Sequence, residues 1–233
     1  MQRNRYLVLL VVLVFSHVAL PTLRMLMPGA HGMLQKLVML SLLAMLLFAI
    51  LFAVSKKTAV RATAILLAVS ALAARGIDVV MPSIALDAIA LLCMVAILLM
   101  IIGSGLRVLF RPMVVTIDTI SASLCVYILM VLLWANLYAL VDLLLPGSFA
   151  YSLDENFTMN MRDGQAIYAT YYSFVTITTL GYGDILPVSP PAMALATLQA
   201  FVGQMYVAIL VARLVSVYSA PGTEPADGDN REH

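Results

Sequence analysis

The chain has 233 residues, of which 63% are hydrophobic and only 11% are charged. Soluble domains carry roughly 25% charged residues, so this composition excludes an ordinary soluble protein and indicates an integral membrane protein. The formal net charge is +1 and no basic run occurs, which argues against a nucleic-acid partner. Cys93 and Cys125 lie inside apolar runs, and we interpret both as small buried side chains without a disulfide.

Apolar segments recur along most of the chain. A spanning helix needs about 20 predominantly apolar residues. Six segments are candidates, the third being short: 6–26, 34–54, 59–74, 84–106, 121–145 and 191–217. Basic residues before the first segment also resemble a secretory signal, but no small-residue cleavage site follows. The sequence therefore predicts an all-α membrane protein with six transmembrane helices, the first of them uncleaved.

The distribution of basic residues predicts the orientation of these helices. Cytoplasmic loops carry an excess of Lys and Arg. With both termini in the cytoplasm, nine of the thirteen basic residues lie inside. These are Arg3, Arg5, Lys56, Lys57, Arg61, Arg107, Arg111, Arg213 and Arg231. We expect a multi-pass protein of the plasma membrane, in a bacterium the inner membrane.

The fifth segment carries its polar and aromatic side chains near the predicted outer end. Trp134 and Tyr138 are four residues apart and share one helix face. We interpret them as an interfacial aromatic belt, and we place Asp142 at the outer membrane surface. Residues 146–164 are rich in polar side chains and are predicted to form an outer loop.

A shorter apolar stretch, residues 166–180, precedes the last segment and contains several hydroxyl side chains. It is too short to span a membrane, and a re-entrant segment is tolerated where protein or water surrounds it. The sequence Thr179-Leu180-Gly181-Tyr182-Gly183-Asp184 follows. Glycine adopts positive φ freely, so this backbone can alternate conformations and aim successive carbonyls to one side. Taken alone, Gly-Tyr-Gly-Asp is also compatible with a simple turn.

The last segment begins after Pro190 and Pro191, which suit the first turn of a helix. Gly203 lies in its interior and predicts either a kink or a close helix contact. Further along, a stripe at helical spacing is expected to line the cytoplasmic end of a pathway. Its members are Tyr206, Val207, Leu210 and Leu214.

From Ala169 to Asp184 the chain reads ATYYSFVTITTLGYGD, and with its two flanking helices it resembles the pore module of the tetrameric potassium channels. The resemblance covers residues 121–218. It implies a homotetramer that conducts K⁺ passively, with a re-entrant pore helix over residues 168–178 between helices five and six. The backbone carbonyls of the selectivity filter would bind K⁺. The filter residues are Thr179, Leu180, Gly181, Tyr182 and Gly183.

The resemblance also assigns roles around the filter. Tyr171 and Tyr172 stand where relatives have aromatic residues that brace the filter, partly by hydrogen bonds to its tyrosine; interfacial placement is the alternative. Thr178 precedes the filter, and Asp184 follows it at the outer mouth, where four carboxylates would concentrate cations. Gly203 matches the position of the gating hinge.

Four helices before a pore module is the layout of voltage-gated channels, but the charges of a voltage sensor are missing. Steep gating needs three or four charges per subunit. Segment 84–106 contains no basic residue, and Arg107 and Arg111 only follow it. We therefore expect weak or no voltage dependence. Arg75, Asp78 and Asp87 are residual charges near the outer ends of the third and fourth segments, where an ion pair is possible, although surface placement is the simpler interpretation.

The predicted division is a four-helix membrane domain at 1–117, a pore domain at 118–218 and a disordered cytoplasmic tail at 219–233. Neither metal-ligand spacing nor a nucleophile and base arrangement appears, so we expect no enzyme activity, no cofactor and no metal beyond the transported K⁺. The predicted partners are membrane lipid and identical or related subunits. Two alternatives stay open: a voltage-dependent channel with atypical charges, and a non-conducting regulatory subunit.

Overall fold

The computed structural model describes residues 58–109, 117–151 and 166–218, together with Tyr6, Leu10, Val11, Val14 and Phe15. Except for those five residues, the helices predicted at 6–26 and 34–54 lie outside the described residues. The tail predicted at 219–233 also lies outside them. The number of transmembrane helices therefore stays a prediction.

The described part is mostly helical. Its elements are α3 (Thr58–Val80), α4 (Ile84–Leu109), α5 (Ile117–Leu144), β1 (Phe149–Tyr151), α6 (Ala166–Ile177), β2 (Ile185–Pro187) and α7 (Pro190–Tyr218). Within these described ranges, three helices are long and apolar enough to cross a membrane. They cover Ile84–Arg107, Thr119–Leu144 and Pro190–Ser216.

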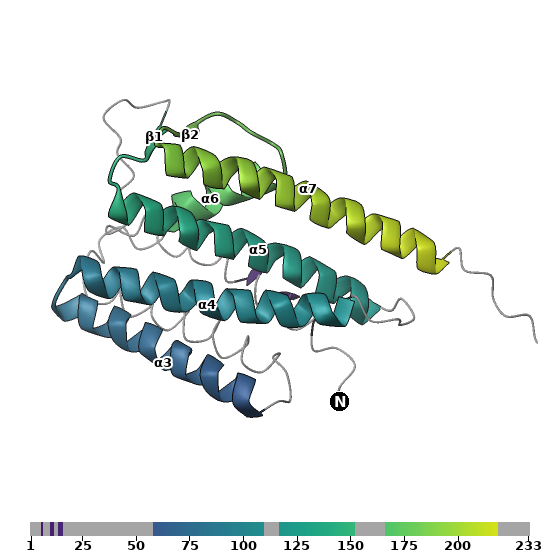
Figure 1. The fold of residues 1–233 in the computed structure, drawn as a ribbon, viewed down its shortest axis with the longest axis horizontal. Helices are drawn as coiled ribbons and strands as arrows, with labels where there is room; N and C mark the ends of the chain where they lie inside the picture. Colours follow the sequence, from purple (N-terminus) through teal and green to yellow (C-terminus); the bar gives the residue numbers. More distant parts are fainter. Residues whose placement is uncertain are drawn as a thin grey trace, which may run out of the picture.

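Figure 1 shows α3, α4 and α5 side by side, with α7 along the other side of α5. The short helix α6 lies between α5 and α7, at the end of the molecule where β1 and β2 are. The turn between α3 and α4 lies at the same end, and there the amide of Ser83 donates to Asp78 Oδ1 at 2.9 Å. We call this the loop end of the molecule, and we call the end where α4 and α7 finish the opposite end.

Two clusters of buried side chains hold these helices together. One joins α4 to α5 through aliphatic residues such as Ile97, Leu98 and Leu129. The other is aromatic and includes Trp134 and Tyr138, which are 6% and 0% exposed. The predicted interfacial belt is therefore wrong for both residues, because α6 and β1 cover the face of α5 on which they lie.

Asp142, near the end of α5, is also buried, with 4% of its surface exposed, and its place at the outer membrane surface stays a prediction. A local turn covers its side chain: the backbone amides of Gly147 and Ser148 donate to the carboxylate. The carbonyl of Ser148 in turn accepts from the amide of Val188 at 2.9 Å. Through this chain of contacts, the end of α5 is tied to the segment that follows residues 179–184.

An ion pair joins α3 to α4, contrary to the surface placement that we preferred. Arg75 Nη1 lies 2.6 Å from Asp87 Oδ1. Asp87 is 5% exposed, in the first turn of an otherwise apolar helix. A carboxylate in such a position requires a partner because burial of an uncompensated charge is costly. The pair therefore joins the two helices at the loop end.

The helix α7 is far less covered than its neighbours. Only 11% of its apolar window is buried, against 56% for α5. Ala192, Gln199 and Gly203 form its buried side, whereas large apolar residues on its other sides are exposed, including Phe201 at 62% and Val215 at 58%. Such an extended apolar surface must be covered by lipid or by another chain.

Candidate functional site

The loop after α6 continues directly from the last helical turn. The amides of Thr178 and Thr179 donate to the carbonyls of Phe174 and Thr176, both at 3.1 Å. The Thr178 hydroxyl also donates to the Phe174 carbonyl at 2.7 Å. These bonds hold the start of the loop on the axis of α6.

The next two amides both return to one acceptor on α6. Leu180 and Gly181 donate to the carbonyl of Val175, at 3.0 and 3.3 Å. In a trans peptide the N–H and C=O groups point in opposite directions. The carbonyls of Thr179 and Leu180, which share peptide planes with these amides, therefore point away from α6. Two successive carbonyls are thus presented on the same side of the loop.

Positive φ angles alternate along the loop. Thr179 has φ 57°, Gly181 has φ 58° and Gly183 has φ 75°. Thr179 has the only positive φ of a non-glycine residue in the described part of the chain. This conformation costs an L-residue about 1–2 kcal/mol. In this conformation, the Thr179 hydroxyl donates to the carbonyl of the preceding residue, Thr178, at 2.7 Å. The alternation that the glycines permit is therefore present, and it extends to Thr179.

The loop lies open on the side away from α6. All residues from 178 to 183 are exposed, with Leu180 at 55% and Tyr182 at 66%. A single chain therefore supplies carbonyl oxygens on one side of any bound ion and leaves the other side uncovered.

The two tyrosines of α6 have different surroundings. The Tyr171 hydroxyl donates to Asp184 Oδ2 at 2.7 Å, and the backbone amide of Ile185 donates to Asp184 Oδ1 at 3.0 Å. Both oxygens of this carboxylate are therefore held. Tyr172 is buried instead, and its ring packs edge-on against Tyr138 at a centroid distance of 4.9 Å. Tyr171 thus contacts the residue after the loop, whereas Tyr172 joins the aromatic cluster behind it.

A buried polar network behind α6 was missed from the sequence. Gln199 of α7 is 0% exposed and donates to both the carbonyl and the hydroxyl of Ser173, at 3.0 and 2.7 Å. The Ser173 hydroxyl donates to the carbonyl of Val131 at 2.7 Å, and the Tyr138 hydroxyl donates to Gln199 Oε1. The network connects α5, α6 and α7. Its only sequence signal is an amide side chain within an apolar helix.

Gly203 lies where α7 approaches the end of α6 most closely. A β-carbon at Gly203 would come within 2.5 Å of Ile177 Cγ1 and 3.0 Å of the Ile177 carbonyl oxygen. That oxygen also accepts the Tyr127 hydroxyl of α5 at 3.3 Å. Of the two interpretations of Gly203, the close helix contact is therefore observed directly; its role as a hinge stays a prediction.

Tyr206 does not line an open pathway in this chain. Its hydroxyl donates to the Ser123 carbonyl at 2.7 Å, and its ring stacks on Tyr127 at a centroid distance of 6.0 Å. The predicted stripe is therefore wrong for Tyr206, because this side of α7 packs on α5. Val207 is the exposed member of the stripe, at 41%. Within the described ranges, no three His, Cys, Asp or Glu side chains gather as metal ligands.

Comparison with known proteins matches the region built from α5, α6, the loop and α7. Residues 126–220 match a family model described as an ion channel. Two pore potassium channel b from Oryza sativa subsp. japonica is 41% identical over 64 residues, or 28% of this chain and 18% of that protein. Inward rectifier potassium channel Kirbac3.1 from Paramagnetospirillum magnetotacticum is 28% identical over 104 residues, or 45% of this chain and 34% of that protein. No solved structure matches the chain.

The packing at Gly203 predicts the effect of a single methyl group. Gly203→Ala should lower the free energy of unfolding by about 1–3 kcal/mol because the added carbon overlaps Ile177. Thermal unfolding in detergent would measure this. The matched control is Gly103→Ala on α4, where a β-carbon meets nothing within 4 Å. That variant should be unchanged or more stable by up to about 1 kcal/mol.

A second substitution separates packing from hinge motion. If packing is the reason for the glycine, Gly203→Ala should cost less stability in an Ile177→Ala background than in the unsubstituted protein, because the overlapping Cγ1 is then absent. Full stability of Gly203→Ala with altered channel opening would contradict the packing explanation and favour a hinge.

The buried network predicts a specific role for the amide of Gln199. Gln199→Leu leaves the buried Tyr138 hydroxyl without its acceptor, at about 1–3 kcal/mol, whereas the Ser173 hydroxyl still donates to the carbonyl of Val131. Adding Tyr138→Phe should recover part of that loss. Gln204→Leu is the matched control, because Gln204 lies on the same helix and is exposed. Equal thermal stability of Gln199→Leu and Gln204→Leu would show that the network contributes little.

Proposed function

We propose that this chain forms a potassium-selective channel, because residues 126–220 match a family model described as an ion channel and the matched relatives are potassium channels. Conduction is passive, and K⁺ is the transported ion. The selectivity filter consists of Thr179, Leu180, Gly181, Tyr182 and Gly183. No cofactor is required, and the protein is not an enzyme.

The observation that carries this proposal is the direction of the filter backbone. The amides of Leu180 and Gly181 point back to Val175, and positive φ recurs at every second residue from 179 to 183. This arrangement supports a row of carbonyls that faces away from α6 and replaces the hydration shell of K⁺. Asp184, held by Tyr171, adds negative charge at the outer mouth.

The open face of the filter supports a homotetramer. One chain leaves residues 178–183 exposed and only 11% of the α7 window buried. Four copies around an axis would surround the ion with carbonyls and cover the apolar side of α7 at the same time. A closed ring of identical subunits uses one repeated contact and leaves no edge open.

In the proposed assembly, residues 1–117 form a four-helix membrane domain and residues 118–218 form the pore domain. Six transmembrane helices place both termini in the cytoplasm of a plasma membrane. Tyr172 on α6 and Thr178 directly after it support the filter, and Gly203 serves as the point at which α7 meets the pore helix and bends during gating.

The charges of α3 and α4 support weak or absent voltage dependence. Arg75 is paired with Asp87, and α4 otherwise carries only Arg107, in its last turn. If the two paired side chains move together, their opposite charges cancel, and no net charge crosses the membrane field. We expect an effective gating charge below about one elementary charge per subunit in voltage-step recordings, against three or four for steep gating. Several charges per subunit would contradict this and favour the voltage-dependent alternative.

The central test is ion flux through the chain reconstituted alone in liposomes. With a tenfold K⁺ gradient opposed by a Na⁺ gradient, the reversal potential should follow K⁺ at about 59 mV. A reversal potential that ignores the K⁺ gradient would reject the selectivity. Absence of any flux would favour a non-conducting subunit that assembles with related chains.

The filter geometry predicts the effect of a methyl group at Gly183. Gly183 has φ +75°, a conformation that alanine adopts only with strain. Gly183→Ala should abolish K⁺-selective conduction, whereas Gly103→Ala should conduct normally and serve as the control. Unchanged selectivity of Gly183→Ala in the same liposome assay would be incompatible with the carbonyl filter.

A further inference from the structure

The carbonyl of Ile177 is the last of α6, and a tyrosine of α5 donates to it. The three carbonyls before it accept amides of the loop that follows α6; they belong to Phe174, Val175 and Thr176. The Ile177 carbonyl instead accepts the Tyr127 hydroxyl at 3.3 Å. Ile177 is 1% exposed, so its carbonyl depends on a donor from the protein rather than on solvent.

This carbonyl lies at the boundary between α6 and the exposed loop. The Ile177 carbonyl and the Thr178 amide share one peptide plane, and the amide donates to the Phe174 carbonyl at 3.1 Å. The plane is therefore held on both sides, by α5 through Tyr127 and by α6 through Phe174. Ile177 is buried, whereas residues 178–183 are exposed. The last fixed peptide before the filter thus depends on a side chain from another helix.

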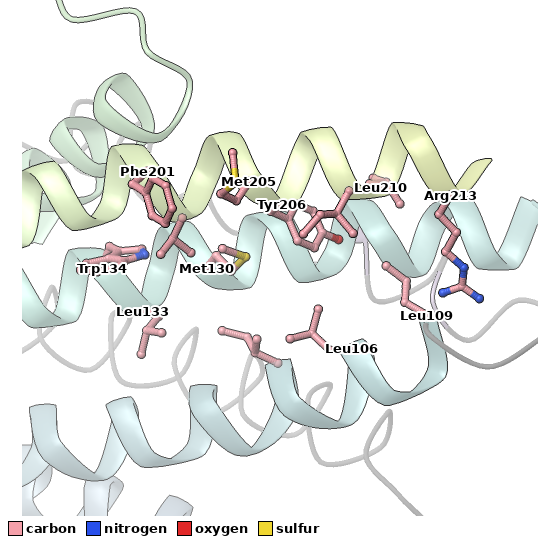
Figure 2. Close-up of a pocket in the computed structure, with 13 residues that line it drawn as sticks. Leu106, Leu109, Met130, Leu133, Trp134, Phe201, Met205, Tyr206, Leu210 and Arg213 are labelled. Carbon is pink, nitrogen blue, oxygen red and sulfur yellow. The ribbon is translucent and has the colours of Figure 1, made fainter. Parts of the chain in front are cut away.

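The ring of Tyr127 is itself held by Tyr206 of α7. The two rings stack at a centroid distance of 6.0 Å with an interplanar angle of 27°. Tyr206 lines the apolar pocket drawn in Figure 2, where its side chain extends from α7 toward α5. Its hydroxyl donates to the carbonyl of Ser123, one turn before Tyr127 on α5, at 2.7 Å. The stack limits the ring positions from which the Tyr127 hydroxyl can reach Ile177.

We propose that Tyr127 is a positioning residue of the filter: its hydroxyl keeps the Ile177 carbonyl directed at α5 and so sets the orientation of the backbone from which the filter starts at Thr179. This inference rests on the proposed potassium-selective function. Without the hydroxyl, the buried carbonyl regains a partner by turning toward the exposed side of the loop. Because the plane turns as a unit, the Thr178 amide then leaves Phe174, and the carbonyls nearest α6 lose the spacing that discriminates K⁺ from Na⁺.

The peptide between Ile177 and Thr178 can be observed by itself, because it is the only Ile-Thr pair of the chain. Labelling isoleucine with ¹³C at the carbonyl and threonine with ¹⁵N therefore gives a single correlated NMR signal. Tyr127→Phe keeps the stacked ring and removes the donor, so the Ile177 carbonyl resonance should move upfield. Tyr206→Phe is the matched control. It removes the same group from the other ring of the stack, where the acceptor is Ser123, and should leave the resonance unchanged.

Ion flux through the same variants tests the effect on the filter. In liposomes with opposed K⁺ and Na⁺ gradients, Tyr127→Phe should raise the permeability of Na⁺ relative to K⁺ about five-fold, or about 1 kcal/mol, the net contribution of one hydrogen bond. Tyr206→Phe should leave this ratio unchanged. A role in stability alone would not separate the two variants, because each loses one hydroxyl that donates to a backbone carbonyl.

The outcomes separate this inference from the proposed function. An unmoved carbonyl resonance in Tyr127→Phe would overturn the contact with Ile177. A moved resonance with an unchanged permeability ratio, or an equal rise of the ratio in both variants, would overturn the positioning role while the channel itself stays K⁺-selective. An unsubstituted chain that does not select K⁺ would reject the proposed function and this inference with it.

Discussion

The carbonyl of Val175 accepts two backbone amides, from Leu180 and Gly181, and this shared acceptor determines the course of the loop after α6. Since those amides point to α6, the carbonyls of the same peptide planes point away from it. The position of α6 therefore determines the direction in which the loop presents its oxygens, and any displacement of α6 would displace them.

Three separate contacts hold α6 in that position. Gln199 reaches Ser173 from α7, and Ser173 continues to the backbone of α5. At the end of α6, the absence of a β-carbon at Gly203 permits the backbone of α7 to lie close to Ile177. Any β-carbon at this position would increase the distance between the two helices. On the other side of the loop, Tyr171 holds Asp184. Since these contacts come from α5, α7 and the loop itself, the support is distributed around α6. The observed contact at Gly203 also means that bending of α7 there would alter the surroundings of α6.

The sequence predicted those parts of the structure whose signals are local. The helices α4, α5 and α7 follow from the length of apolar runs, and the alternation of φ in the loop follows in part from its glycines. Positive φ at Thr179 was not predictable, since an L-residue disfavours it and only the surrounding bonds maintain it. The burial of Trp134 was predicted wrongly, and that of Asp142 was not predicted, for a related reason. Trp134 packs against α6 and β1, and Asp142 accepts from the turn at Gly147. The periodicity of side chains along α5 contains no information about these partners, because they come from other parts of the chain. The pairing of Asp87 with a residue of α3 likewise depends on how two helices are aligned.

The contacts of the last turn of α6 also affect how strongly this end of the helix can attract a cation. In a free helix the final carbonyls have no partners and carry the negative end of the helix dipole. Here those of Phe174, Val175 and Thr176 accept amides of the loop, and that of Ile177 accepts the Tyr127 hydroxyl. Because these donors offset the partial charges of the terminal carbonyls, the attraction of α6 for a cation is weaker than for an uncapped helix. In the proposed channel, the carbonyls of the loop, which point away from α6, would then supply the larger share of the favourable interaction with K⁺. The bonds that cap α6 are the same bonds that aim these carbonyls, so the helix contributes more by positioning the loop than by its own dipole.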